Sequence, residues 1–172
     1  MIRIAGREDL VSAFSVIEQA TAEMKRRGID QWDEHYPNRE ILENDIEKRN
    51  MYVYLAEKEI AGIVALDDRQ PPEYEAVPWA YPGRALVVHR LTVHPAYQGQ
   101  GVASALMQFA EQEIAPGSCE VLRLDAFEEN PAALALYERR DYRYAGSVRF
   151  RKGLFRCCEK PVGPDSTAPA SP

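Results

Sequence analysis

The stretch of sequence that decides the fold is residues 89–115, which read HRLTVHPAYQGQGVASALMQFAEQEIA. It begins at the end of a segment rich in valine and leucine, which predicts a β-strand over residues 84–93. After a turn, apolar residues recur at helical spacing, which predicts a helix over residues 99–115. Two glycines lie at this strand-to-helix turn, where glycine lets the backbone approach a ligand closely.

The turn itself, residues 98–103, reads QGQGVA. The first N–H groups of a helix have no partner within the helix and lie at the positive end of its dipole. The turn therefore predicts a cradle for a phosphate group. A dinucleotide fingerprint would need a glycine where Ser104 stands, and a nucleoside-triphosphate loop would need a lysine after the turn. By spacing alone, a generic anion site and a plain turn before a core helix are both open.

The rest of the chain alternates between strand-like and helix-like patterns. Apolar spacing and capping residues predict helices over residues 7–28, 38–48, 99–115 and 130–140. The predicted strands cover residues 2–5, 51–57, 60–67, 84–93, 121–125, 142–151 and 154–160. This order of elements indicates an α/β (α+β) domain with a mixed sheet and helices on both faces.

The length of 172 residues suits a single domain, which is expected over residues 1–160. Residues 161–172 are rich in proline and poor in apolar residues, which predicts a flexible tail. No apolar run approaches the roughly 20 residues of a membrane-spanning helix. The N-terminus also lacks the features of a secretory signal. A cytoplasmic protein without a membrane partner is therefore expected.

The chain is acidic, with a net charge of −6 and a pI of about 5.2. A nucleic-acid partner is not expected, because it would require a basic face. An acidic surface favours a cationic partner such as an amine, with solubility alone as the competing interpretation. Cys119, Cys157 and Cys158 lack paired metal-type spacing, so free thiols and no metal are expected. A regulatory role for the adjacent pair of cysteines is left open.

Two segments of the chain resemble motifs of the GNAT acetyltransferase family. Residues 98–103 are similar to its Q/R-x-x-G-x-G/A element, in spacing and in position after a strand. Residues 130–142, NPAALALYERRDY, resemble its N-x-x-A-x-x-x-Y-x-x-x-G-F/Y segment, with Asp141 where the family usually has glycine. Aspartate tolerates the left-handed conformation better than most residues, so the helix stop is expected to survive. The order of elements fits the family over residues 1–160.

The resemblance implies an N-acetyltransferase that moves an acetyl group from acetyl-CoA to a primary amine by direct transfer. It also implies a mixed, mostly antiparallel sheet that is splayed at its centre. The implied acetyl-CoA-binding residues are Leu91, Thr92 and Val93 at the splay, Gln98, Gly99, Gln100, Gly101, Val102 and Ala103 at the pyrophosphate, and Asn130 at the pantetheine or thiol. Tyr137 is implied to be the general acid that protonates the CoA thiolate. The residues alone also allow two structural roles. Tyr137 could pack its ring against neighbouring apolar residues, and Asn130 could cap the N-terminus of the helix.

The general base is left open by the resemblance. The candidates are the titratable residues His89, Glu57, Asp125, Asp33, Glu34 and His35. His89 is chosen as the second catalytic residue, because it lies on the strand beside the expected cofactor and histidine titrates near neutral pH. If the strand alternates regularly, His89, Leu91 and Val93 share one face. A purely structural histidine is the competing interpretation.

Four aromatic residues lie in the two loops that border the acceptor site in the family: Trp32, Tyr36, Trp79 and Tyr81. They are predicted to contact the amine substrate by stacking, with loop anchoring as the alternative. Two other functions are kept open: a catalytically silent acyl-CoA-binding sensor or interaction module, and a nucleotide-binding domain. The latter ranks last because both nucleotide motifs are incomplete. A homodimer is also kept open, because family members often pair.

Overall fold

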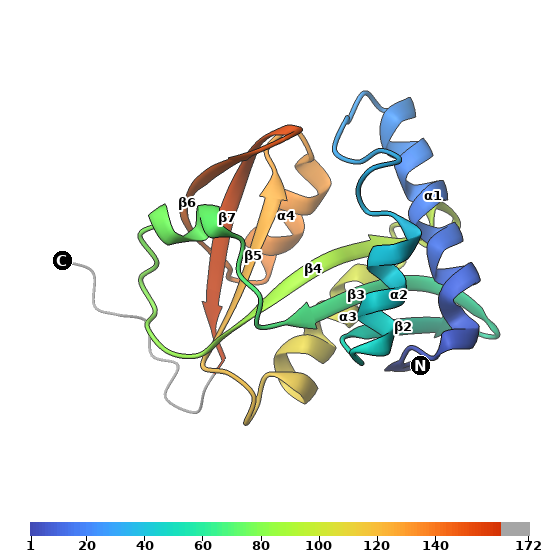
Figure 1. Ribbon diagram of the computed structural model, residues 1–172, viewed down its shortest axis with the longest axis horizontal. Helices are drawn as coiled ribbons and strands as arrows, with labels where there is room; N and C mark the ends of the chain where they lie inside the picture. Colours follow the sequence, from blue (N-terminus) through green and yellow to red (C-terminus); the bar gives the residue numbers. More distant parts are fainter. Residues whose placement is uncertain (163–172) are drawn as a thin grey trace. The chain divides into compact units, whose positions relative to one another are not determined.

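The β-strands form a mixed seven-stranded sheet with the order β1-β2-β3-β4-β5-β7-β6 in the computed structural model, which describes residues 1–162 (Figure 1). The strands are β1 (Ile2–Ile4), β2 (Met51–Ala56), β3 (Glu59–Asp67), β4 (Ala85–Val93), β5 (Val121–Phe127), β6 (Arg143–Phe150) and β7 (Gly153–Pro161). β4 and β5 are parallel, whereas the pairs β1/β2, β2/β3, β5/β7 and β6/β7 are antiparallel. The predicted mixed, mostly antiparallel sheet is confirmed.

The α-helices are α1 (Leu10–Arg26), α2 (Arg39–Glu47), α3 (Val102–Phe109) and α4 (Pro131–Arg139). Each predicted helix is present, but the helix predicted over residues 99–115 begins only at Val102. Gly99 and Gly101 have φ of 76° and 84°, which an α-helix excludes. α3 then continues from Ala110 to Ile114 as a π-helical turn. Among the described residues, no helix is both long and apolar enough to cross a membrane.

The described chain divides into two compact units. The first contains residues 1–66 and 89–107, and the second contains residues 67–88 and 108 onward. β4 belongs to both units, because its nine residues run across this boundary. Its pairing with β5 covers Ala85–Val87, at the beginning of the strand. The predicted site residues are therefore distributed over both units.

In the first unit, α1 and α2 lie side by side over β2 and β3 (Figure 1). Their apolar faces meet inward-facing residues of the strands, such as Met51 and Ile63, in one buried core. α3 packs on the other face of β3, where a Cβ added at Gly62 would lie 2.8 Å from Val102 Cγ1. This close approach of helix to strand places the beginning of α3, and with it the glycine turn.

In the second unit, β5 pairs with β7 from Val121 opposite Pro161 to Phe127 opposite Phe155. β6 and β7 form the hairpin that was predicted at the end of the domain. β7 ends one residue beyond the predicted domain limit at residue 160. The rest of the predicted tail, residues 163–172, lies outside the described residues.

Candidate active site

The glycine turn before α3 has an open backbone. A Cβ added at Gly99 or Gly101 would meet nothing within 4 Å, so the positive φ alone demands glycine at both positions. Ala105 donates its N–H to the carbonyl of Gly101 at 2.9 Å. The N–H groups of residues 101–103 therefore have no acceptor within the helix. The turn fits a phosphate group, which such N–H groups bind well.

Two glutamine side chains hold this turn in place. The side-chain amide of Gln100 donates to the carbonyl of Ala96 at 2.9 Å. That of Gln98 donates to the carbonyl of Val93 at 3.3 Å, which ties the turn to the end of β4. Both bonds lie within the first unit, so the turn has a defined shape before any ligand binds.

β4 does not alternate regularly near its predicted catalytic histidine. Arg90, directly after His89, has a φ of 53°, in the left-handed region. The expectation that His89, Leu91 and Val93 share a face assumed extended backbone throughout, a condition that Arg90 does not meet, so the shared face stays a prediction. His89 and Leu91 are half-buried, and the hydroxyl of Thr92 donates to the carbonyl of Arg90 at 2.8 Å. The role of His89 as general base stays a prediction.

Both ends of α4 are formed as the sequence predicts. At its beginning, Asn130 accepts the N–H of Ala133 on its side-chain oxygen at 3.2 Å. At its end, Asp141 has a φ of 63°, which confirms that aspartate supports the helix stop. The N–H of Tyr142 then bonds to the carbonyl of Tyr137 at 3.0 Å. This arrangement is a Schellman motif, in which the chain turns back over the last helical turn.

Tyr137 is 8% exposed, and its ring meets that of Tyr142 edge to face at a centroid distance of 5.8 Å. Burial raises the pKa of Tyr137 well above its usual value, and the negative charge of Asp125 and proximity to Cys158 raise it further. The phenol therefore keeps its proton throughout the physiological range. Within residues 1–162, its hydroxyl makes no hydrogen bond. Tyr137 packs in the core and also offers a hydrogen-bond donor.

Asp125, one of the candidate bases, accepts a hydrogen bond from the hydroxyl of Tyr74 at 2.7 Å. Tyr74 is buried, and burial together with the carboxylate raises its pKa strongly. The neighbouring Cys157 and Cys158 are buried, and burial raises the pKa of their thiols to about 12 and about 11. Both cysteines are therefore neutral thiols and poor nucleophiles at neutral pH.

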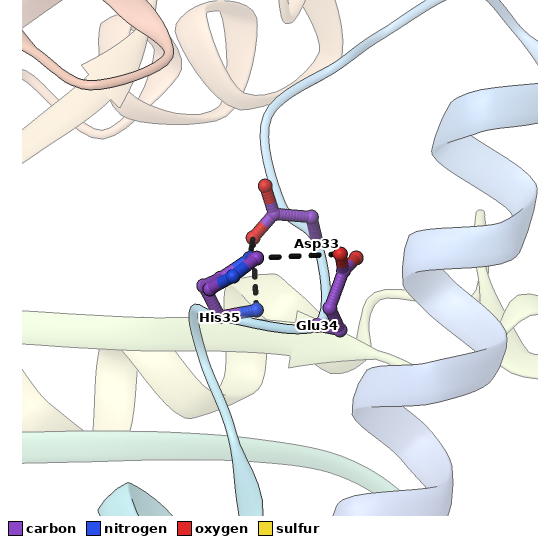
Figure 2. Close-up of side chains that lie close together, drawn as sticks. All are labelled: Asp33, Glu34 and His35. Carbon is purple, nitrogen blue, oxygen red and sulfur yellow. Dashed lines mark hydrogen bonds and ion pairs between the residues drawn. The ribbon is translucent and has the colours of Figure 1, made fainter.

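Three other candidate bases are adjacent in the loop between α1 and α2. Asp33 accepts the N–H groups of His35 and Tyr36 on one carboxylate oxygen, at 3.0 and 3.3 Å. Figure 2 shows the His35 ring beside both carboxylates, with Nδ1 at 3.7 Å from Asp33 and 3.6 Å from Glu34. The ligand atoms of these three residues lie within 4.8 Å of one another. Because His35 and Glu34 are exposed, the cluster by itself does not distinguish a metal site from a solvated loop.

The two predicted acceptor-contacting aromatics of the first unit have different surroundings. Trp32 is buried in the core formed by α1, α2 and the strands. Tyr36 is 39% exposed, and its hydroxyl accepts a hydrogen bond from Arg90 at 3.2 Å. Tyr36 thus presents a surface that a ligand can reach, whereas Trp32 anchors the loop. Contact of either residue with an acceptor stays a prediction.

The aromatics of the second unit lie in a loop with many internal contacts. The indole N–H of Trp79 donates to the carbonyl of Tyr74 at 3.0 Å, and the Arg123 guanidinium lies 4.4 Å from its ring centroid. The backbone carbonyl of Tyr81 accepts a hydrogen bond from Arg123 at 3.1 Å. One face of Trp79 therefore already holds a cation from the protein, and substrate contact by Trp79 or Tyr81 stays a prediction.

Sequence reasoning missed two charged groups that support these sites. Arg90 forms an ion pair with Asp45 of α2, and both side chains are buried. Glu111, in the π-helical turn, bonds to Arg140 and to Lys160, which joins the end of α4 to β7. The signal that could have found Arg90 is its charge inside a mostly apolar strand. Nothing local marks Glu111, because its partners lie far along the chain.

Comparison with known proteins shows the family to which the chain belongs. A sequence model of the acetyltransferase (GNAT) family matches residues 14–142. The chain is 27% identical over 144 residues to the uncharacterized N-acetyltransferase YesJ of Bacillus subtilis (strain 168), covering 81% of this chain and 79% of that protein. The crystal structure of a GNAT-family acetyltransferase from Streptococcus agalactiae 2603 matches with a TM-score of 0.83 at 26% identity, covering 94% of each chain.

The ribosomal-protein-S18-alanine N-acetyltransferase of Escherichia coli matches with a TM-score of 0.70 at 18% identity, covering 100% of this chain and 97% of that one. At this identity the likeness concerns the fold alone. The family match, by contrast, spans most of the chain and includes the glycine turn and Tyr137. The chain is therefore an acetyltransferase of the GNAT family, a family whose cosubstrate is acetyl-CoA.

Proposed function

We propose that this acetyltransferase transfers an acetyl group from acetyl-CoA directly to a primary amine. The observation that carries the proposal is the turn before α3, where two glycines with positive φ leave the backbone open. Residues 98–103 would bind the pyrophosphate through N–H groups at the helix N-terminus. Residues 91–93 of β4 would pair with the pantetheine arm, and Asn130 would contact the pantetheine near the thiol.

Tyr137 is proposed as the general acid. In the reaction, the amine nitrogen bonds to the thioester carbonyl carbon, the C–S bond breaks, and the sulfur needs a proton. Tyr137 is protonated at neutral pH, as phenols ordinarily are, and burial raises its pKa further. A phenol with a raised pKa gives up its proton less readily, so a hydrogen bond to the sulfur as the C–S bond breaks is its main contribution. After the nitrogen has attacked it carries one further proton, and loss of that second proton restores any tyrosinate.

The acceptor must lose a proton before it attacks, and His89 is the proposed base. It is half-buried on β4, within the same unit as the glycine turn. Asp125 is a weaker candidate, because its carboxylate already accepts a hydrogen bond from the hydroxyl of Tyr74. The name of the Bacillus subtilis relative, an N-acetyltransferase, supports nitrogen as the acceptor atom.

The test is a thiol-release assay with acetyl-CoA against a broad amine library of small amines, amino acids, polyamines and peptides. Binding of acetyl-CoA is measured in parallel by calorimetry. We expect binding, together with thiol release that requires an amine and yields the N-acetylated product. Binding without transfer to any amine would instead identify the silent acyl-CoA-binding module. Absence of binding would overturn the proposal.

A further inference from the structure

Arg90 is an unusual residue for the interior of a β-strand. Its backbone has a φ of 53°, which a residue other than glycine adopts only at an energetic cost. Its side chain is 6% exposed, so the positive charge is buried. Strained backbone of this kind persists only where surrounding contacts hold it in place, and it is concentrated at functional sites. The contacts of Arg90 therefore indicate what it does.

The first contact of Arg90 is with Asp45 of α2. Arg90 Nε lies 2.7 Å from Asp45 Oδ2, and the Asp45 side chain has no exposed surface. A buried charge is tolerated only when it is paired, so each residue holds the other in place. The pair joins β4 to α2 within the first unit and fixes the direction of the guanidinium.

The second contact of Arg90 is with the loop between α1 and α2. Arg90 Nη1 donates to the hydroxyl of Tyr36 at 3.2 Å. The loop is closed on itself by backbone bonds between Asp33 and Tyr36, at 3.1 and 3.3 Å. Trp32, on the other side of this small loop, is buried in the core. The loop therefore has two attachments, an apolar one at Trp32 and a polar one at Tyr36.

We propose that Arg90 is a positioning residue for the acceptor site. Held by Asp45, it fixes Tyr36, and with it residues 29–38, against the strand that binds acetyl-CoA. The inference rests on the proposed function and on the predicted contact of Tyr36 with the amine. Arginine suits this task because its guanidinium carries several nitrogens: Nε forms the ion pair with Asp45 while Nη1 donates to Tyr36. Lysine would keep the positive charge beside Asp45 but has no second nitrogen to donate to Tyr36.

The experiment compares Tyr36→Phe, Arg90→Lys and the double variant in the full chain. The first readout is amide hydrogen exchange of residues 29–38, and the second is the KM for the best amine of the library. Each single variant is expected to speed exchange in the loop and to raise the amine KM about fivefold, the effect of losing one hydrogen bond. The KM for acetyl-CoA stays within about twofold, because the glycine turn is unaffected.

The double variant and a control make the test specific. If Arg90 acts through Tyr36, the double variant has the same amine KM as the single variants, because they remove the same bond. Tyr144→Phe is the matched control, since it also removes the hydroxyl of an exposed tyrosine, one that lies 3.1 Å from Ser147 Oγ. It is expected to leave both the exchange and the KM unchanged.

Two results would overturn the proposal. One is unchanged loop exchange and unchanged amine KM in Tyr36→Phe, a variant that keeps the buried ion pair and is expected to fold. The other is a double variant whose effects on KM multiply, since the two residues would then act independently. If the unmodified protein acetylates no amine, the proposed function fails, and that result is seen without any variant. In that case, amide hydrogen exchange of residues 29–38 in the variants still shows whether Arg90 holds Tyr36.

Discussion

The backbone N–H of Tyr142 bonds to the carbonyl of Tyr137 at 3.0 Å, and the two rings meet edge to face at 5.8 Å. Tyr137 is the third residue from the end of α4, and Tyr142 is the second residue after the helix cap. These are the two positions that commonly make an apolar contact in a Schellman motif. The spacing Y-x-x-x-G-F/Y is therefore the signature of a helix end, and this helix end holds the candidate acid in place.

Substitution of Tyr137 by phenylalanine tests its role as general acid. The ring contact with Tyr142 remains, whereas the hydroxyl is lost. We expect the turnover number to fall about 100-fold, the lower part of the range for general acid–base catalysis. Steady-state kinetics and calorimetric binding of acetyl-CoA measure the two effects separately, and affinity should stay within about twofold. An unchanged turnover number would remove Tyr137 from the chemistry.

The left-handed residue Asp141 sets how α4 ends. Asp141→Gly is expected to raise the free energy of unfolding by about 0.5–1 kcal/mol, because glycine adopts positive φ without a penalty. Asp141→Val is expected to lower it by about 1–2 kcal/mol, since a β-branched residue is strained there. Urea denaturation measures both changes. The structure predicts opposite signs for the two variants, so a change of the same sign in both would contradict it.

The glycine turn is tested by Gly101→Ala, with Gly117→Ala as the matched control. Both glycines have positive φ, 84° and 79°, and open space around an added Cβ, so both variants carry the same backbone strain. Only the change at Gly101 is expected to weaken acetyl-CoA binding. A loss of about tenfold or more corresponds to one hydrogen bond to a charged group. Equal affinities in the two variants would mean that the turn does not bind the cosubstrate.

The buried thiols of Cys157 and Cys158 predict a loss of stability at alkaline pH. Their folded pKa values are about 12 and about 11, above the value of about 8.5 expected in an unfolded chain. Between pH 8.5 and 11 the unfolded chain binds fewer protons than the folded one, so the free energy of unfolding falls as pH rises. Below about pH 8.5 the contribution is fully present.

Each thiol should contribute up to about 1.4 kcal/mol per pH unit to this alkaline slope. Urea denaturation between pH 8 and 10.5 measures the slope in the unmodified protein and in Cys157→Ala. Buried tyrosines add their own alkaline slope, so the difference between the two proteins is the informative quantity. The variant should have lower stability at neutral pH but a shallower slope. Identical slopes would show that Cys157 ionises equally in both states.

Most of the fold could be predicted because its signals are local. The strand before residue 94, the glycine turn and the caps of α4 at Asn130 and Asp141 all depend on neighbouring residues. Turn and cap preferences act over a few positions, so the sequence contains them directly. The beginning of α3 was misplaced by three residues, because helical periodicity does not reveal that glycines before a helix have positive φ.

The irregularity of β4 could not be predicted. Regular alternation was assumed for His89, yet the neighbouring Arg90 is left-handed and buried. Its partners, Asp45 and Tyr36, lie far away in sequence, and no local pattern joins them. An ion pair of this kind forms only when the fold removes both charges from water.

By itself, then, the sequence determined the order of strands and helices, the glycine turn before α3 and the placing of Tyr137 one turn before a helix stop. These features follow from backbone preferences of adjacent residues. Tertiary structure alone decided the raised pKa values of Tyr137, Cys157 and Cys158 and the attachment of Tyr36 to Arg90. Each of these depends on which residues, distant in sequence, bury a group or lie beside it. Desolvation and charge pairing act through space and not along the chain.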